Sequence, residues 1–227
     1  MQTRRAQIPE RPFQMPDERP AGNGSLGRYA PEPFSPYMSQ MKRILDLWLS
    51  MLIVVAVFPW LFPLLCLLVL LDTGWPVFFV QERVGLNGRI FNCYKFRTMK
   101  TRISGHPASI SRLGRFLRDS KLDEIPQVFN VLSGKMSFVG PRPHMLSDHE
   151  AFSRMLGEQY HLRHLVKPGI TGLAQIRGYE GRINTPHKLR GRVRLDLFYI
   201  NNWSLGLELQ IIFRTIWHIF KGILQWG

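Results

Sequence analysis

The longest apolar stretch of the chain runs from Leu47 to Leu71 without a single charged residue. A membrane-spanning helix needs about 20 apolar residues, so this stretch is long enough to enter a bilayer. Pro59 and Pro63 stand in its middle, where each removes a backbone donor and disfavours a straight helix. The pattern therefore predicts a membrane segment that is broken near Phe58 and Pro59.

Basic residues flank this segment on both sides. Lys42 and Arg43 precede it, and a series of arginines and lysines follows between residues 83 and 102. Because basic flanks stay on the cytoplasmic side, both ends of the segment are expected there. We therefore predict a re-entrant helical hairpin over residues 41–73 that enters and leaves the same leaflet, in preference to a straight span.

Residues 1–40 are rich in proline and glycine, carry scattered arginines and show no apolar period. Such a stretch cannot bury enough apolar surface to offset the entropy of ordering, and it is predicted to be a disordered tail. No signal-peptide pattern precedes the apolar segment, so the tail is expected to stay on the chain.

The remainder alternates between short β-rich runs and helical periods. Val77–Val80 and Ile90–Phe96 read as two strands, with turn residues at 85–88 between them, and predict a β-hairpin. Apolar residues at helical spacing predict helices over 110–120 and 122–132, one or two over 145–165, and an amphipathic helix over 207–226. The basic face of the first of these helices fits either solvent or a membrane surface.

Charge limits the partners of the chain. It has 30 Lys and Arg residues against 16 Asp and Glu, a formal net charge of +14. This excess predicts an anionic partner, whether phospholipid head groups, phosphorylated substrates or nucleic acid. The two cysteines are too few and too far apart for a disulfide framework or a zinc site, and the histidines follow no zinc-binding spacing.

The candidate chemistry centres on Asp123 and Glu124, within the string SKLDEIPQVFNVL. The string predicts that both carboxylates lie at a helix N-terminus, where acidic residues serve as caps. Arg118, Lys121 and Arg142, which stands between two prolines, add cations around this pair. Adjacent carboxylates bind Mg²⁺ together with substrate phosphates, and a carboxylate can also attack a phosphoryl group. Capping alone remains the alternative for the pair.

Several longer strings resemble the bacterial sugar transferase family, the monotopic phosphoglycosyl transferases. They are KRILDL, PVFFVQERVGLNGRIFNCYKFRTM, LGRFLR, KLDEIPQVFNVLSGKMSFVGPRP, VKPGITGLAQ and YINNWSL, spread from about Lys42 to Phe220. The C-terminal part is most similar to undecaprenyl-phosphate glucose or galactose phosphotransferases, which begin exopolysaccharide, capsule and O-antigen synthesis.

The resemblance implies a two-step transfer of a hexose-1-phosphate. Asp123 would attack the sugar-linked phosphate of a UDP-sugar and release UMP, and undecaprenyl phosphate would then displace the covalent phosphosugar. It implies that Glu124, with Asp123, holds Mg²⁺ as the cofactor. The same resemblance assigns substrate contacts to residues in the KFRTM, LGRFLR, GPRP and PGITGLAQ motifs, which are Lys95, Arg97, Arg118, Arg142 and Gln175.

Two departures from the family pattern concern the substrate. Arg177, two residues after Gln175, stands where many relatives have an asparagine, and the segment between Met99 and Ser111 is shorter than in the glucose-type relatives. The sequence therefore leaves open which sugar is used, which pathway is served, and whether the chain forms a homodimer.

Together these patterns predict an α/β fold, a small and mostly helical catalytic body with a short β-hairpin on a re-entrant membrane helix, assisted by amphipathic interface helices. The catalytic domain would span residues 74–227 and end in the amphipathic helix. It would face the cytoplasm at the bacterial inner membrane and contact lipids. Nucleic acid is not expected as a partner. The alternatives are a membrane-tethered, basic nucleic-acid-binding protein and a membrane scaffold without activity, although the intact Asp-Glu pair disfavours the scaffold.

Overall fold

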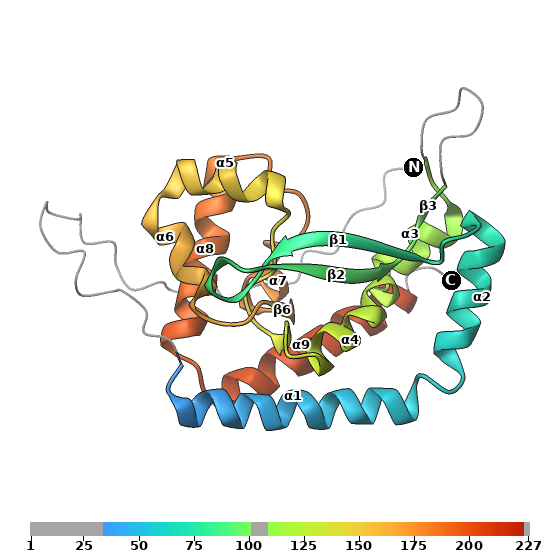
Figure 1. The fold of residues 1–227 in the computed structure, drawn as a ribbon, viewed down its shortest axis with the longest axis horizontal. Coiled ribbons are helices and arrows are strands. Elements are labelled where there is room, and N and C mark those ends of the chain that lie inside the picture. The colour runs from blue at the N-terminus through green and yellow to red at the C-terminus, as the bar shows by residue number, and fades with distance from the viewer. Residues whose placement is uncertain (1–33, 101–108, 225–227) are drawn as a thin grey trace, which may run out of the picture. The chain divides into compact units, whose positions relative to one another are not determined.

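The computed structural model describes residues 34–100 and 109–224 (Figure 1). Most of the predicted tail, residues 1–33, lies outside this range. The first helix, α1 (Pro36–Ala56), begins five residues before the boundary predicted for the tail. Ser35 caps it by accepting a hydrogen bond from the backbone N–H of Met38 at 3.2 Å, and a proline at the first position needs no partner.

The apolar segment folds as two helices, because α1 ends at Ala56 and α2 (Leu61–Thr73) begins after a break of four residues. Pro59 lies in that break, while Pro63 sits in the first turn of α2, where backbone N–H groups have no helical partner. The predicted break is confirmed. Among the described helices none is by itself long and apolar enough to cross a membrane, whereas α1 and α2 pass that test together and are bent by 71°.

Helix α1 turns its polar face toward the rest of the protein. Lys42, Asp46 and Ser50, spaced four residues apart, are all buried. The Asp46 carboxylate accepts hydrogen bonds from the Ser137 hydroxyl and the Phe138 backbone N–H, each at 2.9 Å. The opposite face is apolar and exposed, as the residues Ile44, Trp48, Met51, Leu52 and Val55 show. The helix is thus held by polar contacts and presents its apolar side outward.

The predicted hairpin is present. Strands β1 (Phe78–Val84) and β2 (Ile90–Phe96) pair antiparallel, and the turn between them contains the short 3₁₀ helix η2 (Leu86–Gly88). Asn87 and Gly88 adopt positive φ angles of 53° and 74°, which glycine and asparagine tolerate best. β1 extends four residues beyond its predicted end at Val80.

Two smaller sheets were not predicted. β3 (Met99–Lys100) pairs antiparallel with β4 (Ser109–Ile110), and β5 (Ser137–Val139) pairs parallel with β6 (Gly169–Thr171). The parallel pair needs close backbone approach: a Cβ added at Gly140 would lie 2.5 Å from the carbonyl oxygen of Lys167. Each strand has at most three residues, which is too short for a period to show in the sequence.

The predicted helices form with altered boundaries. They are α3 (Arg112–Asp119), then η3 (Leu122–Gln127) with α4 (Val128–Leu132), then α5 (Leu146–Leu156), α6 (Glu158–His161) and η4 (Leu162–Leu165), and finally α9 (Leu205–Leu224). Two helices were missed, α7 (Leu173–Ile176) and α8 (Pro186–Asn201). α8 has a start signal, since Thr185 accepts from the Lys188 N–H and a proline follows the cap, but its interspersed arginines hide the apolar period.

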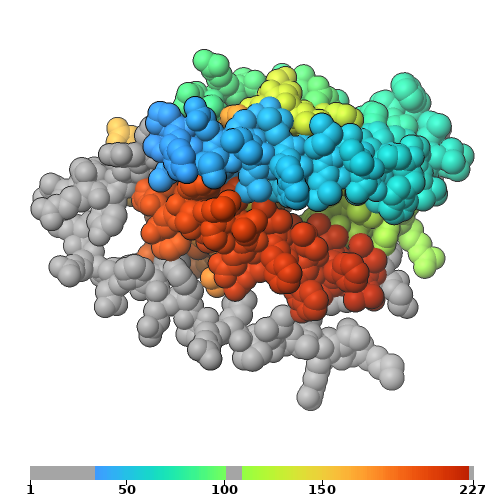
Figure 2. Space-filling model, turned by 90° about the horizontal axis from the view of Figure 1, so that it is seen from below, coloured from blue at the N-terminus to red at the C-terminus, as the bar shows by residue number. Residues whose placement is uncertain are grey.

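Two hydrophobic clusters position the elements of the site. One joins α8 and α9 to β5 through Val139, Tyr199 and Ile211. The other joins α2 to β2 and α3 through Val69, Phe96 and Leu117. Helices α1 and α9 lie side by side along one face of the protein (Figures 1 and 2).

Candidate active site

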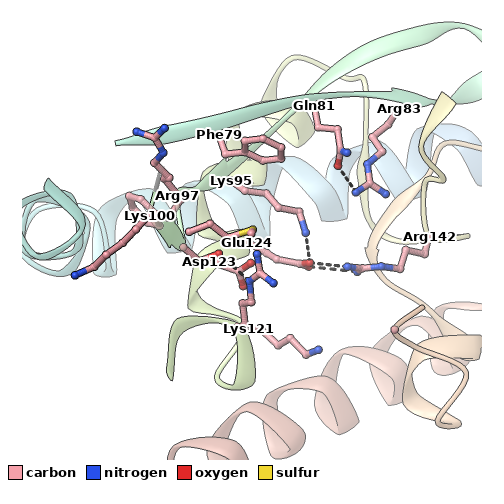
Figure 3. A pocket seen from close by; sticks show the side chains of 15 residues that line it. Phe79, Gln81, Arg83, Lys95, Arg97, Lys100, Lys121, Asp123, Glu124 and Arg142 are labelled. Carbon is pink, nitrogen blue, oxygen red and sulfur yellow. Dashed lines mark hydrogen bonds and ion pairs between the residues drawn. The ribbon is translucent and has the colours of Figure 1, made fainter. Parts of the chain in front are cut away.

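A cavity of about 580 Å³ opens beneath the β1–β2 hairpin (Figure 3). Its volume lies within the usual range for small-molecule sites. Two carboxylates, Asp123 and Glu124, line it together with basic side chains from β1, β2, β3, α3 and the loops: Arg83, Lys95, Arg97, Lys100, Arg118, Lys121 and Arg142. A cavity with this excess of cations suits a ligand that carries several negative charges.

The carboxylates owe their position to a reversal of the chain between α3 and η3. Lys121 adopts a left-handed conformation with a φ angle of 60°, which is uncommon for a residue other than glycine. Asp123 and Glu124 follow in the first turn of η3, as predicted, although this element is a 3₁₀ helix and not the start of one long α-helix. Ser120 ends α3 and does not cap η3, because its hydroxyl donates to the Phe116 carbonyl.

Glu124 is buried and held by two cations. Its Oε1 accepts from Lys95 Nζ at 2.6 Å and from Arg142 Nη2 at 2.7 Å, and its Oε2 has a longer contact of 3.4 Å to Arg142 Nη1 (Figure 3). Burial by itself would raise the pKa of Glu124, but the attraction of Arg142 and Lys95 outweighs it and holds that pKa well below its usual range. Glu124 is therefore ionised at every pH at which the protein is expected to work.

Asp123 is in the opposite condition. It is 7% exposed, and within residues 34–100 and 109–224 no hydrogen bond or ion pair to its carboxylate is found. Burial, and then the negative charge of Glu124, raise the pKa of Asp123 to about 6. The carboxylate is thus ionised at neutral pH yet more basic than an ordinary aspartate, which is the condition of a nucleophile or general base.

Arg142 is fixed from behind by a buried network. Arg163, which is 1% exposed, donates from Nη2 to the Arg142 carbonyl at 2.7 Å. Asp196 on α8 accepts from Arg163 Nε at 3.0 Å and from its Nη2 at 2.7 Å. An ion pair this deeply buried orients the loop that carries Arg142, and through Arg142 it also orients Glu124. Sequence reasoning missed Arg163 and Asp196, since only the fold brings η4 and α8 to this loop.

The structure brings six of the seven predicted site residues to one cavity. Lys95, Arg97, Arg118 and Arg142 line it with Asp123 and Glu124. Two of the bases are held at its wall, Arg118 by a bond from Nε to Thr98 Oγ1 at 2.7 Å and Arg97 by a bond to the Trp75 carbonyl at 3.0 Å.

Gln175, the seventh predicted residue, does not line this cavity. It lines a neighbouring cavity, and its side-chain amide donates to the Ile170 carbonyl at 3.0 Å.

The cavity also contains residues that were not predicted for it, among them Phe79, Gln81 and Arg83. These alternate along β1, so they share one face of the strand, and a strand read through Val84 would have revealed them. Arg83 is held by bonds to the Pro143 carbonyl at 2.8 Å and to the Gln81 side chain at 2.5 Å.

The donor set fits Mg²⁺ only together with a substrate. Among the described side chains there is no group of three or more His, Cys, Asp or Glu residues that could hold a metal ion. Mg²⁺ commonly binds through one or two carboxylates, waters and substrate phosphates, so Asp123 and the less engaged Oε2 of Glu124 meet that requirement.

Comparison with known proteins identifies the class. The family model of the bacterial sugar transferases matches residues 37–222, and the chain belongs to that family. Membership favours a transferase over the nucleic-acid-binding alternative.

The curated relatives include two named as undecaprenyl-phosphate sugar phosphotransferases. The chain is 42% identical over 192 residues to a UDP-glucose:undecaprenyl-phosphate glucose-1-phosphate transferase of Klebsiella pneumoniae, covering 81% of this chain and 40% of that protein. It is 39% identical to the exopolysaccharide production protein PSS of Rhizobium leguminosarum bv. phaseoli, covering 78% of this chain and 93% of the relative. A UDP-N-acetylgalactosamine-undecaprenyl-phosphate N-acetylgalactosaminephosphotransferase of Aeromonas hydrophila is 36% identical, over 87% of this chain and 47% of the relative. The chain thus spans about two fifths of the length of the first of these relatives.

Proposed function

We propose that this protein transfers a hexose-1-phosphate from a UDP-sugar to undecaprenyl phosphate, as the first step of exopolysaccharide, capsule or O-antigen synthesis. The observation that carries the proposal is Asp123, a buried carboxylate without a partner among the described residues, in a cavity rich in cations. Family membership and the names of the relatives support the same reaction. The relatives' names contain both glucose and N-acetylgalactosamine. UMP release from a panel of UDP-sugars would identify the sugar.

In the first step, an Asp123 carboxylate oxygen bonds to the sugar-linked phosphorus, and the bond from that phosphorus to the bridging oxygen breaks. UMP leaves with the electron pair, and the sugar phosphate remains on Asp123 as an acyl-phosphate. In the second step, a phosphate oxygen of undecaprenyl phosphate bonds to the same phosphorus. The Asp123 carboxylate leaves unchanged, and the product is undecaprenyl-diphosphate-sugar.

The surrounding residues stabilise charge during both steps. Arg97 and Arg118 are suited to the phosphate oxygens, since they line the cavity and their positions are fixed by hydrogen bonds. Glu124 keeps Lys95 and Arg142 in place beside the reacting phosphorus. When bound, Mg²⁺ would be held by Asp123 and Glu124 with the substrate phosphates and would neutralise charge on the phosphate oxygens.

The membrane side of the proposal rests on the exposed apolar residues of α1, α2 and α9. Among them are Trp48, Leu71, Phe213, Trp217 and Phe220, each more than half exposed. Exposed apolar residues gathered on neighbouring helices mark interaction sites, and aromatic residues favour the membrane interface. We therefore place α1 and α2 in the cytoplasmic leaflet of the inner membrane as a re-entrant hairpin, with α9 lying in its interface.

The test of the reaction is intact-mass analysis of the enzyme given a UDP-sugar without lipid acceptor. Wild-type protein should gain the mass of one phosphosugar and release one UMP. Asp123→Asn should show no adduct and should lose turnover by about a thousandfold or more, because the nucleophile is gone while its shape is kept. Glu158→Gln, on an exposed position of α6 outside the cavity lining, is the control and should behave as wild type. A wild type without adduct under every quench, or a fully active Asp123→Asn, would overturn the covalent mechanism.

A further inference from the structure

A second cavity of about 390 Å³ lies between α1 and α9, and the function proposed above gives it no role. Its walls are mainly apolar: α1 contributes Leu49, Leu52 and Ile53, and α9 contributes Ile212, Ile216 and Ile219. Leu52 is 51% exposed and Ile216 is 54% exposed, so the cavity reaches the surface on the face where the two helices lie side by side (Figure 2).

The inner end of this cavity differs in character. Its charged lining consists of Lys121 and the carboxylates of Asp119, Glu124 and Glu180. Glu124 is already paired with Lys95 and Arg142, and Glu180 with Lys121. Lys121 and Glu124 also line the basic cavity that contains Asp123. The two cavities therefore approach each other beside the carboxylate pair, one lined by cations and the other by aliphatic side chains. Among the described residues, the ion pair of Lys121 is with Glu180, at 3.0 Å and with both side chains at least 40% exposed. Such an exposed pair contributes little, so Lys121 can turn to an incoming anion at low cost.

A ligand that fits this cavity has an aliphatic chain and one anionic end. The chain would fill the space between α1 and α9 and emerge at their exposed apolar side, while the anionic end would meet Lys121. A nucleotide-sugar does not match these walls, because its hydroxyl groups would lose their hydrogen bonds to water among isoleucines and leucines. The basic cavity suits the nucleotide instead.

We propose that the cavity between α1 and α9 binds the first isoprene units of the polyprenyl phosphate acceptor and leads its phosphate past Lys121 to Asp123. This inference rests on the proposed function for the identity of the acceptor. The two substrates then reach the carboxylate pair from different sides, the UDP-sugar from beneath the hairpin and the lipid from between the two helices. The rest of the isoprenoid chain remains in the membrane.

A kinetic test fills the cavity with a larger side chain. Ile216→Trp places an indole in the lining, whereas Ile223→Trp makes the same change two turns further along α9, on an exposed residue outside the lining. We expect the KM for undecaprenyl phosphate to be about tenfold higher in Ile216→Trp than in Ile223→Trp, because the overpacked cavity excludes the chain. The KM for the UDP-sugar should not separate the two variants. Equal acceptor KM values in two folded variants would overturn the proposal.

A binding experiment keeps this inference distinct from the proposed reaction. A polyprenyl phosphate with a diazirine on its second isoprene unit is irradiated with the protein in lipid nanodiscs, and the labelled peptides are identified by mass spectrometry. Label on residues 49–53 and 212–219 that is lost in Ile216→Trp supports the site even if no sugar is transferred. Label confined to the outward faces of α1 and α9 contradicts it. A phospholipid with a diazirine in its acyl chain serves as the control. If it labels these residues and undecaprenyl phosphate does not displace it, bulk lipid occupies the cavity and the proposal is contradicted.

Discussion

Asp123 and Glu124 show how two adjacent carboxylates acquire different properties. Glu124 is enclosed by Lys95 and Arg142, which hold its pKa well below the usual range against the effect of burial. Asp123 keeps no such partner among the described residues, and its burial beside Glu124 raises its pKa to about 6. Environments that separate two pKa values in this way fit the different roles that we propose, an electrostatic anchor for Glu124 and a nucleophile for Asp123.

Replacing Glu124 by Gln tests the anchor. The change keeps the shape but leaves Lys95 and Arg142 without their counterion, and it removes a carboxylate proposed for Mg²⁺. We expect turnover to fall by about a hundredfold and the Mg²⁺ concentration for half-maximal activity to rise. Glu82→Gln, on the opposite and exposed face of β1, is the control. If EDTA leaves wild-type turnover unaffected, the magnesium hypothesis is wrong, and an unchanged Mg²⁺ titration in Glu124→Gln would remove Glu124 as a ligand.

At the scale of elements, the break between α1 and α2 decides how the apolar segment can meet a membrane. Four residues separate the helices, and the two helices are bent by 71° at this break. Pro59 lies in the break and cannot donate a backbone hydrogen bond, which favours the bend. The inward face of α1 is fixed by further contacts, since Arg43 donates to the carbonyls of Val131 and Leu132 at 2.6 and 2.8 Å. The bend and these contacts together set the distance between α1 and the carboxylate pair.

Replacing Pro59 and Pro63 together by Leu should weaken the bend, because both backbone donors return and helix propensity rises. We expect the protein to stay membrane-bound and to lose most of its activity, as the site moves relative to the lipid phosphate. In a background without native cysteines, Ser39→Cys and Asn87→Cys should both be protected from an impermeant thiol reagent in intact cells and react after lysis. Labelling of Ser39→Cys in intact cells carrying the unaltered prolines would show that the segment spans the bilayer.

At the scale of the whole molecule, a buried ion pair joins the two helices of the exposed apolar face. Lys42 of α1 lies 2.5 Å from Glu208 of α9, with side-chain exposures of 6% and 1%. Glu208 also accepts from the Tyr199 hydroxyl at 2.7 Å and from Trp203 Nε1 at 2.9 Å, and Lys42 donates to the Val139 carbonyl at 2.7 Å. Residues 166 positions apart in sequence thus fix the separation of α1 and α9.

Breaking this pair should destabilise the fold. Lys42→Met leaves the Glu208 charge buried without its cation, which costs about 3–5 kcal/mol in comparable pairs. Glu208→Gln should also lower the thermal unfolding temperature in detergent. The double variant should lose less stability than the sum of the losses in the two single variants, because it contains no buried charge without a counterion. Strictly additive losses would show that the two side chains are not coupled.

The two β-rich runs with turn residues between them were sufficient to predict the hairpin, and the charge-free apolar segment with its prolines was sufficient to predict the break, because these depend on local backbone chemistry. Helix α8 was missed because buried Arg192, which donates to the carbonyls of Tyr179 and Gly181, interrupts the apolar pattern. Arginines that satisfy loop carbonyls inside the protein cannot be distinguished in a sequence from solvated ones.

The sequence by itself determined the apolar segment, the carboxylate pair, its basic neighbours and the resemblance to the family, since each is carried by residues close together in the chain. Only the tertiary structure decided that Lys95 and Arg142 form ion pairs with Glu124. It also decided that Gln175 lines a different cavity from Asp123, and that α1 turns its polar face inward. These depend on contacts between residues far apart in sequence, where side-chain geometry and burial fix which charges meet. For that reason the fold, and not the local sequence, sets the opposite pKa shifts of Asp123 and Glu124.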